Sequence, residues 1–162
     1  MIVIADASVL ISLSTIGRIG IIRDRFPDGI LIPSAVWKEV VEQGKERPGA
    51  KEVASADWIT VRQVEDSRFV QYLTMGIDEG EAEAIGLARE TNAQVILIDE
   101  RDARDVAKGL GIQVLGTIGL LIWAKRAGKL KNLKHELDNL QELAKFRVSA
   151  ELYQLCLEEV GE

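Results

Sequence analysis

Two aspartates stand directly after apolar runs that are typical of buried strands. Asp6 follows residues 2–5, and Asp99 follows residues 95–98. Continuous apolar runs of this length suit parallel strands, which are covered on both faces. Because the carboxyl ends of parallel strands share one edge of the sheet, where open α/β folds bind ligands, we expect both carboxylates at that edge. One such acid alone commonly caps the next helix, whereas two favour a functional site.

Two glutamates on expected helices extend this acidic set. In the segment 78–88 an apolar stripe recurs at about 100° per residue, and Glu81 lies on the side of this stripe. We therefore expect Glu81 to point inward, with Asp78 as a second inward candidate and Glu83 toward solvent. A capping box between Glu81 and Asp78 is the structural alternative. Glu39 lies at the margin of an apolar stripe in an expected helix, where surface solvation explains it equally well.

The composition narrows the chemistry that these acids can perform. The chain of 162 residues has one His and one Cys. These are too few for a structural zinc site, and a Ser-His-Asp triad would need His135 as its base. Hard-cation chemistry on carboxylates stays open. The net charge of -6 disfavours binding of nucleic acid by bulk attraction, so phosphate would be bound locally or through a metal.

Short apolar runs alternate with helical patterns along the chain. Strands are expected at 2–5, 30–32, 59–61, 95–98 and 113–115. Helices are expected at roughly 8–14, 18–25, 34–46, 66–75, 79–91, 102–109 and 117–128, and in the tail from 132 to 160. This alternation indicates a single-domain, three-layer α/β/α sandwich with a mainly parallel central sheet, plus C-terminal helices.

The acidic set and its neighbours resemble the PIN-domain family of metal-dependent ribonucleases. The resemblance rests on Asp6 with Ser8 two residues on, on Glu39, on the run 80–85 and on Asp99. Two further runs are similar to a prokaryotic branch related to the toxin nucleases of toxin-antitoxin pairs: 99–104 and 116–121.

The resemblance implies a PIN-like nuclease domain over residues 1–128. Residues 129–162 would then form a C-terminal helical extension packed on the same domain. Two features depart from the family pattern. Glu81 stands where the toxin relatives commonly have Asp, and three acids occupy the four positions 99–102.

By this resemblance, four acids carry catalysis: Asp6, Glu39, Glu81 and Asp99. The expected metal ligands are Asp6, Glu81, Asp99 and Asp102, and Ser8 would hydrogen-bond one of these carboxylates or a water, or cap the first helix. Gathered carboxylates raise each other's pKa unless a cation offsets their charge, and oxygen-only ligands suit Mg²⁺ or Mn²⁺. In the helix after Asp99, the spacing of Arg101, Arg104 and Lys108 makes one basic face that could contact RNA phosphates or simply be solvated.

The implied function is a Mg²⁺- or Mn²⁺-dependent endoribonuclease that acts on single-stranded RNA and serves as the toxin of a toxin-antitoxin pair. A non-catalytic PIN-fold module that binds nucleic acid or protein is the alternative. A haloacid-dehalogenase-like phosphatase would need a second Asp where Ser8 stands. A helical stripe through Leu152, Leu155, Cys156 and Val160 fits core packing or a homodimer, and an antitoxin protein is a further expected partner. With no apolar run long enough for a bilayer, no leader-like start and a lone Cys156, we expect a cytoplasmic protein and no membrane partner.

Overall fold

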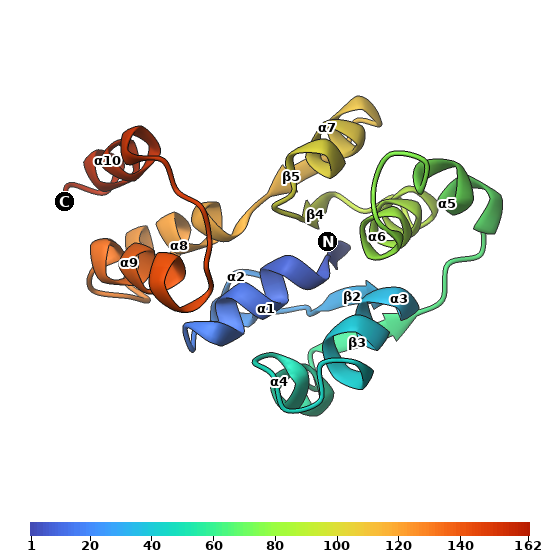
Figure 1. The fold of residues 1–162 in the computed structure, drawn as a ribbon, viewed down its shortest axis with the longest axis horizontal. Coiled ribbons are helices and arrows are strands. Elements are labelled where there is room, and N and C mark those ends of the chain that lie inside the picture. Colours follow the sequence, from blue (N-terminus) through green and yellow to red (C-terminus); the bar gives the residue numbers. More distant parts are fainter.

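Five strands form one parallel sheet in the computed structural model, which describes residues 1–162 (Figure 1). The strands are β1 (Val3–Ala5), β2 (Ile30–Pro33), β3 (Ile59–Arg62), β4 (Val95–Leu97) and β5 (Gln113–Leu115). They lie in the order β3-β2-β1-β4-β5, and every neighbouring pair is parallel, which confirms the predicted α/β fold. The winding reverses between β1 and β4, because the chain returns from β3 to the other side of β1. An open parallel sheet forms its binding crevice at such a point.

Residues alternate between the two faces of the sheet, and both faces are covered. Val3 and Ala5 belong to the larger hydrophobic core, whereas Ile4 belongs to the smaller one on the opposite face. In β4, Leu97 and Ile96 divide in the same way. This two-residue period is what a strand imposes on its side chains. It explains why the runs are continuously apolar rather than alternating in polarity.

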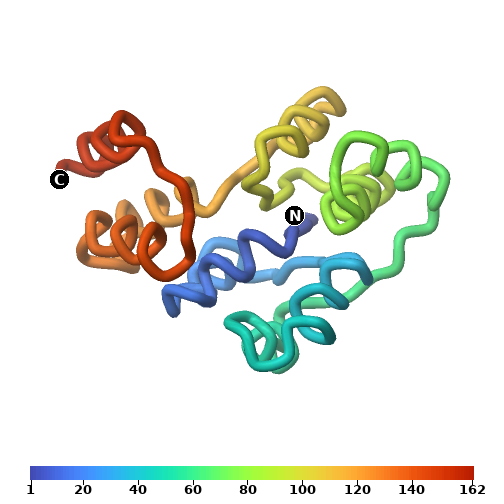
Figure 2. Tube along the Cα trace, in the orientation of Figure 1, coloured from blue at the N-terminus to red at the C-terminus, as the bar shows by residue number.

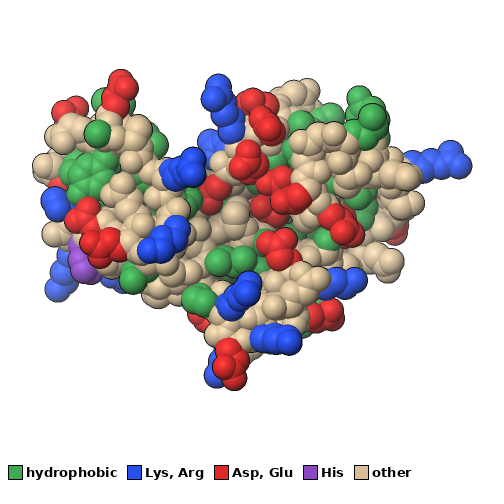
Figure 3. Space-filling view, in the orientation of Figure 1, with side chains coloured by type: hydrophobic (Ala, Val, Ile, Leu, Met, Phe, Trp, Pro, Cys, Tyr) green, Lys and Arg blue, Asp and Glu red, His purple; other side chains and the backbone are tan.

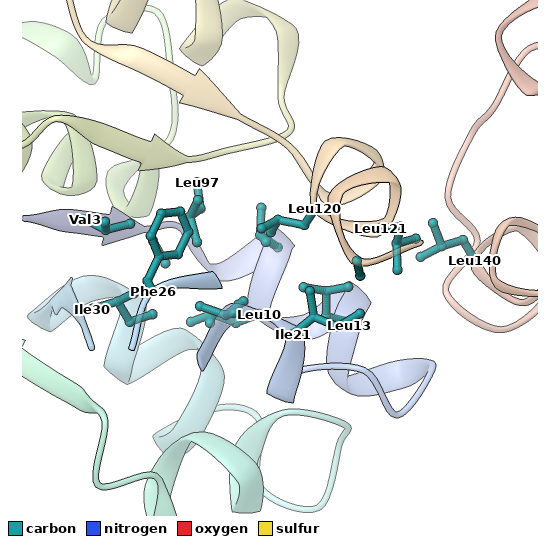
Figure 4. Close-up of a cluster of buried hydrophobic side chains, with 14 of the residues drawn as sticks. Val3, Leu10, Leu13, Ile21, Phe26, Ile30, Leu97, Leu120, Leu121 and Leu140 are labelled. Carbon is teal, nitrogen blue, oxygen red and sulfur yellow. The ribbon is translucent and has the colours of Figure 1, made fainter. Parts of the chain in front are cut away.

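Helices cover both faces and make the outer layers. The larger core contains residues of α1 (Ala7–Thr15), α2 (Gly20–Arg25), α8 (Thr117–Arg126), α9 (Leu133–Leu143) and α10 (Ala150–Glu159). The smaller core contains residues of α5 (Ser67–Leu73), α6 (Glu79–Glu90) and α7 (Arg101–Gly109). Figure 4 shows Val3 and Leu97 of the sheet in the same apolar cluster as Leu10 of α1 and Leu120 of α8. None of these helices has both the length and the apolar character that a bilayer crossing requires.

The region after β2 differs from the single helix expected over residues 34–46. It consists of α3 (Ser34–Trp37), a π-helix, η1 (Lys38–Glu42), and a separate short helix, α4 (Ala50–Ser55). At Gly44 a Cβ would lie only 2.0 Å from the Val40 carbonyl oxygen, so the chain turns there in a way that only glycine allows. The six residues of α4 are too few to show a helical period in the sequence.

The C-terminal tail forms two helices instead of one. An extended segment joins α9 to α10, as Figure 2 shows, and Lys145 within it has a positive φ of 55°. Helix α9 is tied to the turn after α1 by an ion pair in which Arg18 Nη2 lies 2.7 Å from Glu136 Oε1. The apolar stripe on α10 is only partly used in packing, since Cys156 is buried but Leu155 is 53% exposed.

Candidate active site

Six carboxylates surround a hollow at the carboxyl edge of the sheet, next to the ends of β1 and β4. Its volume is about 320 Å³, and it is lined by Asp6, Ser8, Glu39, Asp78, Glu81, Asp99, Glu100, Phe146 and Arg147. Figure 3 shows acidic side chains gathered on the middle of the displayed face, between the region of α10 and that of α6. The four acids expected to carry catalysis therefore lie around one hollow, although they come from four different parts of the chain.

Asp6 is the most deeply placed of these acids. It is only 4% exposed, and its backbone N–H donates to the Leu97 carbonyl across the β1–β4 pair, at 2.9 Å. Asp6 occupies the N-cap position of α1, yet its side chain makes no capping hydrogen bond. Ser8 Oγ donates to Asp6 Oδ2 at 3.3 Å. Burial, together with the nearby charges of Asp78 and Glu39, raises the pKa of Asp6 to about 7.

Glu81 both points inward and closes a capping box at the start of α6. It is 6% exposed. The Asp78 N–H donates to Glu81 Oε1 at 3.1 Å, and the Glu81 N–H donates to Asp78 Oδ1 at 2.8 Å. Burial is the main cause that raises the pKa of Glu81 to about 7, and the charges of Asp78, Asp6 and Glu100 add to it. The two roles considered from the sequence thus occur together.

Gly80 leaves a small space that three carboxylates border. A Cβ on Gly80 would lie 3.4 Å from Glu39 Oε1, 3.6 Å from Asp6 Oδ1 and 3.6 Å from Asp78 Oδ1. All three oxygens lie within 3.6 Å of this one point, so they are close neighbours of one another. Burial and the charge of Asp78 also raise the pKa of Glu39. Uncompensated negative charge is therefore concentrated beside the missing side chain of Gly80.

The donor set fits a hard divalent cation, although it is not a finished coordination shell. No three acidic, His or Cys side chains are yet close enough together to hold a metal ion. The available donors are all carboxylate oxygens, which is the ligand type of Mg²⁺ and Mn²⁺. Burial is the main cause of the raised pKa values of Asp6 and Glu81, and neighbouring carboxylates add to it, so a cation in the hollow would offset both effects by stabilising the ionised groups.

Asp99 is held in place by the junction between β5 and α8. Its Oδ1 accepts from the Thr117 N–H at 2.8 Å, and its Oδ2 accepts from the Thr117 hydroxyl at 2.6 Å. Burial raises the pKa of Asp99, while the Thr117 hydrogen bonds and the charge of Arg104 counteract this rise. A Cβ on Gly116 would lie 2.8 Å from Asp99 Oδ1 and 2.6 Å from Arg104 Nη1, so this close approach requires glycine.

Other residues singled out in the sequence lie around the margin of this hollow. Asp102 lines a neighbouring hollow that shares Asp78, Glu81 and Glu100 with the first, but it does not line the hollow of Asp6. Arg101 and Arg104 line an adjoining groove. Lys108 is exposed and lines neither the hollow nor this groove.

The expectation that Glu83 faces solvent is wrong. Glu83 is half-buried, and its Oε1 accepts from the Ala35 N–H at 3.1 Å. This bond joins α6 to the start of α3, the helical segment that leads to Glu39. The helical period shows that Glu83 points away from the apolar stripe of α6. It cannot show that α3 packs against that other side of α6.

Phe146 and Arg147 were not anticipated at the site. They come from the connection between α9 and α10, and no pattern in the sequence links that connection to the strand ends. The helical period of the sequence marks Asp78 as a second inward candidate, whereas Glu100 stands out only as one of the three acids in positions 99–102. Their place in the hollow follows from the direction in which α6 and α7 begin.

The model of a family described as PIN domain matches residues 2–162. A solved structure, a PilT N-terminus domain protein from the hyperthermophilic archaeon Sulfolobus solfataricus P2, is similar with 19% identity and a TM-score of 0.47, over 82% of this chain and 96% of that one. No protein of curated function matches. Because the family model spans nearly the whole chain, the protein belongs to the PIN-domain family.

Proposed function

We propose that this protein is a Mg²⁺- or Mn²⁺-dependent endoribonuclease that hydrolyses phosphodiester bonds of single-stranded RNA. PIN domains are generally nucleases, and the chain belongs to that family. The observation that carries the proposal is the gathering of Asp6, Glu81 and Asp99 around one hollow, with the pKa values of Asp6 and Glu81 raised to about 7. Such a site gains stability from a cation and from the phosphate that accompanies it.

The side chains of the hollow would have separate roles in the reaction. Asp6 and Glu81 would hold the cation, with Asp99 and Glu39 as further donors, and Ser8 would orient Asp6 through its hydroxyl. When bound, Mg²⁺ or Mn²⁺ supplies Lewis-acid activation of the phosphate and of the attacking water. A carboxylate of the hollow that is not bound to the cation would orient that water and accept its proton.

A cleavage assay with matched variants tests this function. Fluorescently labelled single-stranded RNA is incubated with the protein and Mn²⁺, and the variants Asp6→Asn and Asp99→Asn are compared with Asp105→Asn, an exposed position on α7. We expect the first two to lose cleavage by a factor of roughly 100 or more, because each removes a carboxylate that would hold the cation, and the third to retain it. Circular dichroism verifies that each variant is folded.

The same assay discriminates between the nuclease and a non-catalytic module. Wild-type protein that shows neither cleavage nor thermal stabilisation by Mn²⁺ over EDTA would support the non-catalytic alternative. A phosphatase of the haloacid-dehalogenase kind has no support, because Ser8 stands where its second Asp would be and the chain belongs to another family.

We further propose a toxin role with an antitoxin protein as partner, a homodimeric assembly and a cytoplasmic location. The exposed Leu152 and Leu155 on α10, at 41% and 53%, supply an apolar surface for a second copy or an antitoxin helix. A reducing cytoplasm suits the free, buried thiol of Cys156. Light scattering of the purified protein tests the dimer, and growth arrest on expression tests the toxin role.

A further inference from the structure

The acidic hollow has a second wall that comes from the C-terminal extension. Phe146 and Arg147, between α9 and α10, line the hollow together with its carboxylates. Phe146 also lines an adjoining groove of about 440 Å³, together with Arg101, Arg104 and Leu152 among others. Because Asp99 and Phe146 belong to both, the hollow and the groove meet at these two residues. They form one continuous path along the surface.

The segment that carries Phe146 and Arg147 is held firmly against α9. The Phe146 N–H donates to the Leu140 carbonyl at 3.0 Å, and Gln141 Nε2 donates to the Val148 carbonyl at 3.3 Å. The Phe146 side chain is half-buried and packs against the larger core. A wall built in this way is ordered before a ligand arrives, which reduces the entropy cost of binding.

The arginines along this path form no ion pair, although the charge of Arg104 acts on the nearby Asp99. The ion pairs of the chain involve other cations, and none includes Arg101, Arg104 or Arg147. Arg104 donates through Nη1 to the Ile98 carbonyl at 3.2 Å, which fixes its position and leaves its other nitrogens available. In a chain with a net charge of -6, three arginines along one path, none of them in an ion pair, are a local site for anions.

We propose that Phe146 and Arg147 bind the RNA substrate beside the scissile phosphate, an inference that rests on the proposed function. The Arg147 guanidinium contacts a backbone phosphate at the mouth of the acidic hollow. The Phe146 ring stacks on the base of the adjoining nucleotide, and the strand continues into the groove, where Arg101 and Arg104 contact its phosphates. Only a single strand, whose bases are free to turn outward, can use an aromatic ring in this way.

Single-stranded RNA needs an apolar surface for its bases and cations for its phosphates, and both occur along this path. The groove is about half apolar, with Val114, Leu115 and Ile118 beside Leu152 and Phe146, and this surface can cover the flat face of a base. Its cations supply backbone contacts that the acidic hollow cannot supply by itself. The arrangement therefore accounts for RNA binding by an acidic protein without a large basic surface.

The test measures RNA binding separately from cleavage. A fluorescein-labelled 12-nucleotide RNA is titrated with the cleavage-impaired Asp6→Asn protein, alone or with Arg147→Ala, Phe146→Leu or Arg23→Ala, at several salt concentrations. Arg23→Ala removes the same charge from an exposed position on α2 that lines neither the hollow nor the groove. Phe146→Leu keeps apolar packing but removes the aromatic face, and thermal melting verifies its folding. The same substitutions in the otherwise wild-type chain are assayed for KM and kcat in Mn²⁺.

We expect Arg147→Ala to raise the Kd roughly 5-fold or more and to lower the slope of log Kd against log salt by about 0.7, the value for one phosphate contact on a single strand. Phe146→Leu is expected to raise the Kd roughly 10-fold without changing this slope, because stacking does not release counterions. Both should raise KM more than they lower kcat, and Arg23→Ala should change none of these quantities.

Different results would separate this inference from the nuclease proposal. If wild-type protein cleaves RNA but both variants bind it like the control, the inference fails and the nuclease proposal stands. Faster cleavage by Arg147→Ala would also overturn it, since the segment would then obstruct the site. If the variants weaken binding as expected but the wild type never cleaves, the RNA path stands and the nuclease proposal fails. A protein that neither binds nor cleaves single-stranded RNA would overturn both.

Discussion

Replacing Asp6 by asparagine should stabilise the metal-free protein at neutral and alkaline pH. In the folded chain the pKa of Asp6 rises from 3.8 to about 7, chiefly because the carboxylate is buried. At about 1.4 kcal/mol for each pKa unit, the ionised group costs about 4 kcal/mol of folding free energy at pH 8. The Asn amide keeps part of the desolvation cost, so we expect a gain of roughly 2–4 kcal/mol, or about 4–16 °C in Tm for a chain of this length.

The stability difference between Asp6→Asn and wild type should depend on pH. A carboxyl group whose pKa is raised on folding contributes its stability below pH 4, and this contribution is lost as pH rises to about 7. The difference between Asp6→Asn and wild type should therefore be small at pH 4, grow through pH 5 and 6, and become constant above pH 7. Thermal melting in EDTA at these pH values measures it, with Asp105→Asn as the control for loss of one exposed charge.

Divalent cations should reverse the order of the two proteins. Mn²⁺ binds the ionised carboxylates, so its stabilisation of wild type should increase from pH 6 to pH 8, as Asp6 and Glu81 lose their protons. The Asp6→Asn protein should gain little from Mn²⁺. The reasoning is refuted if Asp6→Asn is less stable than wild type in EDTA at pH 8, or if its advantage is the same at every pH.

Three further predictions concern the supports of the site. Gly80→Ala places a methyl group at 3.4–3.6 Å from three carboxylate oxygens. We expect unchanged or slightly raised stability in EDTA, by roughly 0.5–1 kcal/mol of helix propensity, but weaker Mn²⁺ stabilisation in a thermal shift assay. Gly116→Ala must displace Asp99, since its Cβ would lie 2.8 Å from Oδ1, and RNA cleavage should fall at least about 10-fold; unchanged activity would mean that the position of Asp99 does not matter. Arg18→Ala leaves Glu136, 2% exposed, without its ion-pair partner, and urea unfolding should show a loss of about 2–3 kcal/mol; a loss below about 0.5 kcal/mol, as surface pairs show, would contradict this role.

The strands and the acids that end them could be predicted because their signals are local. Residues 2–5 and 95–98 are continuously apolar, and in a parallel sheet both faces of such strands are buried. The carboxylates of Asp6 and Asp99 follow directly, so a parallel arrangement was enough to place both at one edge. Glu81 could be directed inward by the helical period of its own segment.

The partners of these acids were decided only by the tertiary structure. Thr117 holds Asp99 from 18 positions along the chain, and the ion pair of Arg18 and Glu136 spans 118 positions. No local period encodes which segments pack together over such separations, since this depends on how whole helices and strands fill the space around the sheet. For the same physical reason, the α9–α10 connection could not be recognised in advance as a wall of the acidic hollow.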